Sequence, residues 1–151
     1  MLVTNHVLSG AAIGAAVGRP ATAFALGVAS HFALDTTPHW GRFGSQRQYL
    51  SVAVPDGLTG LAVIAGATAL APPGRRVAVL AGMAGAALPD LDKPSKLFFG
   101  RSPFPPVVDR FHQRIQREAP RRAHYEAVAA VLFGAVAFAL LRGRERDRAT
   151  M

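Results

Sequence analysis

The sequence predicts an all-α fold: a small membrane bundle of about five apolar helices, with one amphipathic helix lying at the membrane interface. Half of the 151 residues are hydrophobic, and only 17% are charged. The apolar residues gather in five segments of helical length, separated by short stretches rich in Gly and Pro. We therefore expect a single helical membrane domain over residues 1–142, with a long polar loop at 93–122 and a charged tail at 143–151.

The five segments differ in length, and length decides which of them could cross a bilayer. A membrane helix needs roughly 20 apolar residues, with about 17 as the lower limit. The last segment meets this requirement, the third nearly does, and the other three are short enough to be buried helices of a soluble protein. Joined by short turns, they predict a compact bundle of thin or tilted helices. The segments are residues 2–18, 20–35, 55–71, 77–88 and 123–141.

The first segment carries small residues at a spacing of four, at Gly10, Gly14 and Gly18. In an apolar helix this spacing makes a face that a second helix can approach closely. The spacing predicts a helix-packing surface, which is also a candidate contact for a homo-oligomer. Pro20 then opens the second segment, since Pro is favoured in the first turn of a helix.

The second segment ends on three groups that can bind a metal, His31, Asp35 and His39. Four-residue spacing places His31 and Asp35 on one helix face, one turn apart. Pro38 disfavours helix at Thr37, so the helix should end near Asp35 and His39 should fold back toward that end. The alternative is a helix C-terminus with a dipole-compensating His.

Two further regions are more polar. We expect residues 41–48 to form a loop, and residues 93–106 to form a second loop rich in Pro and Phe. Residues 107–118 should follow as an amphipathic helix, because Val107, Val108, Phe111 and Ile115 fall on one face. Such a helix suits a membrane surface, and it also suits the surface of a soluble protein.

Threading the five segments in alternation through a bilayer brings the polar groups to one side. A carboxylate near hydrocarbon persists where it is paired, metal-bound or in a wet cavity. A group of carboxylates also needs a cation to offset mutual repulsion. The distribution therefore predicts a divalent-metal site, against the alternative of unrelated helix caps. The predicted metal ligands are His6, His31, Asp35, His39, Asp56, Asp90 and Asp92.

Other groups on the same side suggest roles in hydrolysis. His112 and His124 are candidates for the general acid or base, because histidine titrates near neutral pH. Arg110 and Arg114 could hold a phosphate. Zinc is the first choice of metal, and manganese or iron would also suit a carboxylate-rich site.

Composition excludes some chemistry. The chain has no Cys, so thiolate metal sites and disulfides are ruled out. The net charge of +8 comes from Arg residues that flank apolar runs, which suits anionic lipid headgroups better than nucleic acid. The first apolar run lacks a charged flank and a clear cleavage site, so we expect no signal peptide.

Several short motifs together resemble a protein family. They are Thr4-Asn5-His6, Ser30-His31-Phe32-Ala33-Leu34-Asp35 followed by Pro38-His39-Trp40, and Pro89-Asp90-Leu91-Asp92. The chain is similar to uncharacterised bacterial integral membrane proteins of the putative membrane-bound metal-dependent hydrolase type, which includes LexA-regulated inner-membrane proteins. The resemblance implies a multi-pass protein of the inner membrane with polar site residues at His6, His31, Asp35, Asp90 and Asp92. Many such hydrolases carry a His-Arg-Gly-x-Thr-His-Ser motif, which this sequence lacks; Phe111-His112-Gln113-Arg114 is the stretch that could substitute for it.

The leading hypothesis is therefore a membrane-embedded metal-dependent hydrolase that acts at the lipid interface, with a headgroup phosphoester as a reasonable substrate class. The alternatives are a non-catalytic membrane protein with a structural metal site or a transport role, and a soluble helical bundle with a metal in its core.

Overall fold

The computed structural model describes residues 1–149, with the backbone alone for residues 144–149. The expected all-α fold is confirmed: helices make up most of the described chain, and its two strands are three residues long. The elements are α1 Val3–Val17, α2 Pro20–Asp35, β1 Pro38–Trp40, α3 Gln46–Leu70, η1 Pro73–Arg75, α4 Arg76–Ala87, η2 Leu88–Leu91, α5 Asp92–Phe99, α6 Pro106–Ile115, β2 Arg117–Ala119 and α7 Ala123–Ala149.

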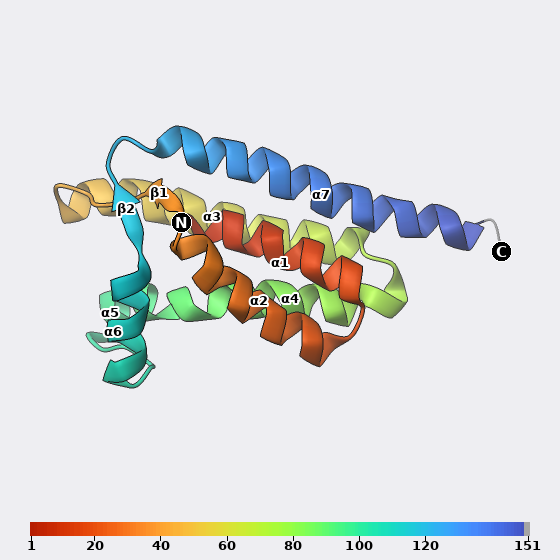
Figure 1. Cartoon of the computed structure of the whole chain (residues 1–151), viewed down its shortest axis with the longest axis horizontal. Coiled ribbons are helices and arrows are strands. Elements are labelled where there is room, and N and C mark those ends of the chain that lie inside the picture. Colours follow the sequence, from red (N-terminus) through yellow and green to blue (C-terminus); the bar gives the residue numbers. More distant parts are fainter. Residues whose placement is uncertain (150–151) are drawn as a thin grey trace.

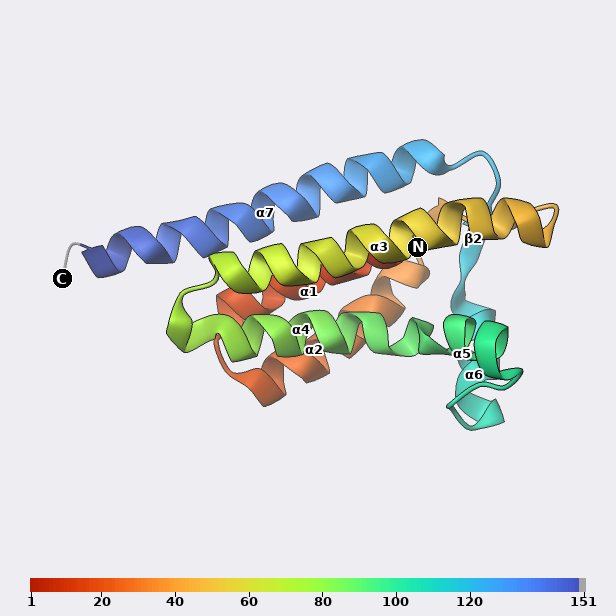
Figure 2. The same cartoon turned by 180° about the vertical axis from the view of Figure 1, so that it is seen from behind.

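Helix α1 lies at the centre of the bundle and contacts α2, α3, α4 and α7. Consecutive long helices run in opposite directions, as Figures 1 and 2 show. The N-terminus, the end of α2 and the start of α7 lie at one end of the bundle together with α5, α6 and both strands (Figure 1). The alternating arrangement thus gathers the polar segments at one end.

Glycines let α1 and α4 cross with their backbones in contact. A Cβ on Gly10 would lie 2.4 Å from the carbonyl oxygen of Gly82, and one on Gly14 would lie 2.4 Å from that of Ala78. Gly10 and Gly14 therefore pack against α4 of the same chain, and the homo-oligomer contact suggested for this face stays a prediction. Gly18 has a φ of +70° and ends α1 in the left-handed conformation.

Fewer helices than expected have membrane length. By length and composition, two helices in the described chain could cross a membrane: Gln46–Leu70 and the Ala123–Gly143 part of α7. The prediction of a bundle of about five membrane helices is corrected to these two, because α1, α2 and α4, which correspond to the three short segments, have 15, 16 and 12 residues. At 1.5 Å per residue they rise about 18–24 Å, short of a hydrocarbon core of about 30 Å.

The two long helices expose their apolar side chains. Only 6% of the most apolar window of α3 is buried, and 17% of that of α7. Leu58 and Leu61 on α3 are 63% and 64% exposed, and Val131 on α7 is 70% exposed. The core instead consists of small side chains around α1, with Val7, Val79 and Met83 as its larger members.

Helix α3 begins nine residues before the predicted position of the third segment. Ser45 caps it, since its hydroxyl accepts a hydrogen bond from the Gln48 N–H at 3.2 Å. Pro55 lies inside the helix and is exposed. The predicted loop at 41–48 therefore ends at Ser45.

The long polar loop contains more structure than predicted. The Pro/Phe-rich stretch begins with α5, and the predicted amphipathic helix is α6, which ends at Ile115. The next residues form β2, which pairs in parallel with β1. At the other end, the predicted charged tail begins within the last turns of α7, and residues 150–151 lie outside the described chain.

Candidate metal centre

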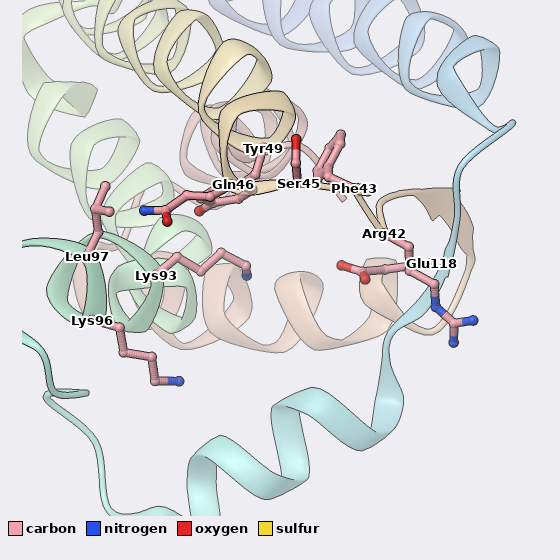
Figure 3. A pocket seen from close by; sticks show the side chains of 9 residues that line it. All are labelled: Arg42, Phe43, Ser45, Gln46, Tyr49, Lys93, Lys96, Leu97 and Glu118. Atoms are coloured by element: carbon pink, nitrogen blue, oxygen red, sulfur yellow. The ribbon is translucent and has the colours of Figure 1, made fainter.

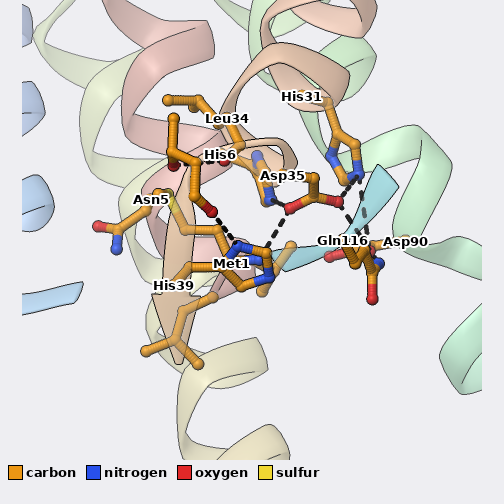
Figure 4. Close-up of polar contacts among 12 residues, drawn as sticks. Met1, Asn5, His6, His31, Leu34, Asp35, His39, Asp90 and Gln116 are labelled. Atoms are coloured by element: carbon orange, nitrogen blue, oxygen red, sulfur yellow. Dashed lines mark hydrogen bonds and ion pairs between the residues drawn. The ribbon is translucent and has the colours of Figure 1, made fainter. Parts of the chain in front are cut away.

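Four buried side chains from three separate segments meet at the polar end of the bundle. His31 and Asp35 come from the last turns of α2, Asp90 from η2 and His112 from α6. One ligand atom of each lies within 4.8 Å of the ligand atoms of the other three. Figure 4 shows His31, Asp35 and Asp90 lying together. A buried cluster of two His and two Asp can hold a metal ion.

The shortest contacts among the four residues are made by His112 Nε2, one of them to His31 Nε2 at 3.0 Å. His112 Nε2 lies 2.9 Å from Asp35 Oδ2, and His31 Nε2 lies 3.2 Å from the same oxygen. The His31–Asp35 contact confirms the predicted i, i+4 geometry at the end of α2. Asp90 Oδ1 lies 3.7 Å from both His31 Nε2 and His112 Nε2.

The hydrogen bond of His31 on its far side fixes which nitrogen faces the cluster. His31 Nδ1 lies 2.7 Å from the carbonyl oxygen of Ala86, which can only accept, so Nδ1 donates. In the neutral ring, Nε2 then presents its lone pair to the cluster. Donation from the outer nitrogen to a backbone carbonyl is the usual support of a metal-binding histidine.

His6 and His39 are fully buried beside this cluster, and both have unpartnered ring nitrogens. Neither nitrogen of His6 has a hydrogen bond, although Nε2 lies 3.2 Å from Asp35 Oδ1 and the ring stacks on His31 with centroids 3.9 Å apart. His39 Nδ1 donates to the Thr37 carbonyl at 2.8 Å, and Nε2 has no partner. Burial lowers the pKa of His39, which keeps the ring neutral.

Other groups complete the polar contacts of Asp35. The amine of Met1 donates to Asp35 Oδ1 at 2.8 Å. Gln116, just after α6, donates to Asp35 Oδ2 at 3.4 Å and lies 3.1 Å from His112 Nε2. Asp35 is therefore the centre of the cluster.

Lysines of α5 contact the outer carboxylates. Lys93 pairs with Asp90, and this pairing outweighs the effect of burial, so the pKa of Lys93 is raised. Lys96 pairs with Asp92 at 2.7 Å and with Asp109 at 3.3 Å, and the bond to Asp92 raises the pKa of Lys96. Asp92, a predicted ligand, therefore binds a lysine, although its Oδ1 is buried without a partner.

The remaining predicted site residues lie elsewhere. Asp56 is on α3, and its carboxylate accepts hydrogen bonds from the N–H groups of Val3 and Thr4 at 2.7 and 3.1 Å. It caps α1 and is not a ligand of the cluster. His124 is exposed, and its ring lies tilted against that of Tyr125. Arg110 and Arg114 are exposed on α6, and neither lines the cavity described below.

Sequence reasoning missed Glu126, which is buried at the start of α7. Its carboxylate accepts hydrogen bonds from the Leu2 N–H at 3.1 Å, the Trp40 N–H at 3.0 Å and the Asn5 side chain at 2.7 Å. It thereby ties α7 to α1 and β1. An acidic residue in the first turn of a helix looks like an ordinary dipole partner, so the sequence carries no signal for this role.

The cluster fits a divalent cation by the chemistry of its groups. Two carboxylates and the lone pair of His31 lie within the cluster, and buried ring nitrogens of His6 and His39 have no hydrogen-bond partner. Within the described chain, Met1, Gln116 and Lys93 donate to these carboxylates, and each neutral histidine ring adds one N–H, as in the 2.9 Å contact of His112 Nε2 with Asp35 Oδ2. A cation would satisfy the remaining electron pairs, and imidazole with carboxylate suits zinc, manganese and iron.

Comparisons of the chain with protein-family models, with curated proteins and with solved structures find no match. The resemblance to membrane-bound metal-dependent hydrolases stays a prediction.

Proposed function

We propose that this protein is a membrane-embedded, metal-dependent hydrolase that acts on a phosphoester at the lipid interface. The observation that carries the proposal is the convergence of His31, Asp35, Asp90 and His112 at one end of a bundle with an apolar outer surface. These four residues are the proposed metal ligands. The proposed metal is zinc, with manganese or iron as alternatives.

The exposed apolar faces of α3 and α7 support the membrane part of the proposal. A core helix of this length in a soluble protein would be mostly buried, whereas α3 and α7 are mostly exposed. Exposed apolar area on this scale marks an interaction or membrane surface. The shorter α1, α2 and α4 would be accommodated by bilayer thinning around the bundle. We propose a multi-pass location in the inner membrane.

A metal in this site would lower the pKa of a bound water and polarise the ester. In hydrolysis, the water oxygen forms a bond to phosphorus as its proton passes to a general base, the bond from phosphorus to the leaving oxygen breaks, and the leaving oxygen takes up a proton. His112 lies within the ligand cluster and His124 is exposed, so neither fits the proton-transfer role predicted for it. In our proposal His6 takes the proton-transfer role, because its ring lies next to Asp35 and neither of its nitrogens has a hydrogen-bond partner.

The test is hydrolysis by protein reconstituted in lipid nanodiscs, stripped with a chelator and reloaded with zinc, manganese or iron. A panel of phosphomonoesters, phosphodiesters and phospholipids is the substrate. We expect activity that depends on metal, is lost in His112→Ala and persists in the matched control His124→Ala. Hydrolysis that survives complete metal removal, or that is lost equally in His124→Ala, would contradict the proposal.

A structural metal site is the second candidate, and the near-complete burial of the ligands favours it. His31 and Asp35 are 0% exposed, and His112 is 3% exposed. Structural sites have four protein ligands, whereas catalytic sites keep a position open. A metal that raises the melting temperature without hydrolysis of any panel substrate would establish this role in place of catalysis.

A further inference from the structure

A cavity of about 620 Å³ lies beside the metal centre, between the start of α3, α5 and β2. Its walls include Phe43, Tyr49, Lys93 and Glu118 (Figure 3). The volume lies within the ordinary range for small-molecule sites, about 300–1,000 Å³.

Opposite charges face each other across this cavity. In Figure 3 the Lys93 ammonium and the Glu118 carboxylate point into it from opposite sides, whereas the Arg42 guanidinium points away. Lys93 pairs with Asp90. Among the described side chains, no cation forms an ion pair with Glu118, and the other lysine in the wall is held by Asp92 and Asp109. Within the part of the chain that is described, the cavity therefore holds one carboxylate that lacks a counter-ion, and the ammonium that faces it is paired with Asp90 alone.

The local backbone is arranged to place Glu118 there. Glu118 pairs with His39 in the parallel ladder of β1 and β2. Its side chain crosses directly over Gly41, where a Cβ would come within 2.5 Å of Glu118 Cδ. Any side chain at position 41 would displace the carboxylate, so the glycine leaves room for its approach.

Lys93 connects the cavity to the metal centre, because its ammonium is bound to Asp90, one of the four proposed ligands. A phosphate that reaches Lys93 is therefore adjacent to the site of hydrolysis. A positive group on the same ligand would extend away from the metal centre toward Glu118.

The cavity also lies at a suitable depth for a lipid headgroup. Tyr49 is in the first turn of α3, and Val54, five residues later, is 54% exposed at the start of the apolar surface. Five residues of helix rise about 7.5 Å. The cavity is thus just outside the hydrocarbon region if α3 spans the bilayer as proposed.

We propose that this cavity binds a zwitterionic phosphoester headgroup, a phosphate joined to a short alkylammonium, with the phosphate beside Lys93 and the ammonium beside Glu118. The inference rests on the proposed function and specifies its substrate class. It replaces Arg110 and Arg114 as the predicted phosphate-binding residues.

The test measures binding to metal-free, detergent-purified protein by isothermal titration calorimetry. The probes are phosphoethanolamine, inorganic phosphate and ethanolamine. Each charged contact should contribute about tenfold in affinity, so phosphoethanolamine should bind roughly tenfold tighter than either half. Because no metal is present, failure of hydrolysis or of metal binding would leave this result unaffected.

Variants assign the two ends of the ligand. Glu118→Gln should abolish the preference for phosphoethanolamine over phosphate. Lys93→Gln should weaken the binding of both phosphoethanolamine and phosphate. Arg110→Gln, an exposed cation outside the cavity, is the matched control and should bind as the wild type does. If Glu118→Gln fails to fold by circular dichroism, Glu118→Asp keeps the charge on a shorter side chain and should give a reduced preference.

A further pair of probes distinguishes the source of the headgroup. Dihexanoylphosphatidylethanolamine should bind more tightly than phosphoethanolamine if the natural ligand is a lipid, and equally if it is a soluble phosphoester. Equal binding of phosphate and phosphoethanolamine by the wild type, or an unchanged preference in folded Glu118→Gln and Glu118→Asp, would overturn the proposal.

Discussion

Two pairs of buried or half-buried carboxylates lie at the same end of this bundle, and their surroundings differ. Asp56 and Glu126 accept hydrogen bonds from backbone N–H groups. Asp35 and Asp90 instead face the ring nitrogens of His31 and His112.

The first pair is satisfied by the protein itself, because each N–H supplies a proton to an oxygen. Asp56 caps the start of α1, and Glu126 joins α7 to α1 and β1. In the second pair, the carboxylate oxygens meet histidine ring nitrogens as well as the donors Met1, Gln116 and Lys93, and nearby nitrogens of His6 and His39 lack partners. Carboxylates at the same end of the bundle can thus either anchor helices or be candidate metal ligands. The groups that contact them distinguish the two roles.

The largest effect should follow from Asp35→Asn. The change removes the charge that contacts three histidines and should weaken zinc binding by about 100-fold or more, beyond the 10–100-fold typical of supporting residues. Competition with a chelating dye measures the affinity. Asp56→Asn is the matched control and should bind zinc as the wild type does; equal weakening in both variants would erase the distinction between the pairs.

Glu126→Ala should affect stability and leave metal binding nearly unchanged. The substitution removes the acceptor of the Leu2 and Trp40 N–H groups and of the Asn5 side chain. Each buried donor left unpaired costs about 1–3 kcal/mol. We expect a loss of about 3 kcal/mol in the free energy of unfolding, measured by denaturant titration in detergent. Loss of metal at full stability would place Glu126 in the metal site instead.

Asp56→Ala should have a smaller effect on the same measurement. It removes the cap of α1, and losing a helix cap costs about 1 kcal/mol. Metal content is the accompanying control, and it should not change. A loss as large as that of Glu126→Ala would indicate that Asp56 does more than cap α1.

The smallest effect should come from His124→Ala, since the side chain is exposed. Surface substitutions usually change stability by less than about 0.5 kcal/mol. Its partner variant His31→Ala should lose metal, because His31 is 0% exposed and lies within the cluster. Metal loss in His124→Ala, measured by elemental mass spectrometry, would show that burial does not separate ligands from other histidines here.

The sequence predicts the local part of the cluster and misses the long-range part. The spacing of His31 and Asp35 and the position of Pro38 were enough to place both side chains on one face at the end of α2. The contact of His112 with Asp35 joins residues 77 apart in sequence, and it depends on how α6 packs against α2. No local pattern encodes that packing.

One missed boundary did have a local signal. Ser45-Gln46-Arg47-Gln48 has the Ser-x-x-Gln pattern that begins many helices, and Ser45 is the cap of α3. Pro55 gives a competing signal, because Pro is over-represented at the first position of a helix. By contrast, the approach of Glu118 over Gly41 follows from the pairing of two three-residue strands, which are too short to predict from periodicity.

The most direct test of the account is the metal content of the wild-type protein, purified in detergent and measured by elemental mass spectrometry. Asp35→Ala and Asp90→Ala are measured beside it, with their folds checked by circular dichroism. The account predicts about one equivalent of zinc, manganese or iron per chain, as a single four-ligand site would hold, and its loss from both folded variants. A wild-type protein that holds no metal, even after reconstitution with each of the three ions, would contradict it.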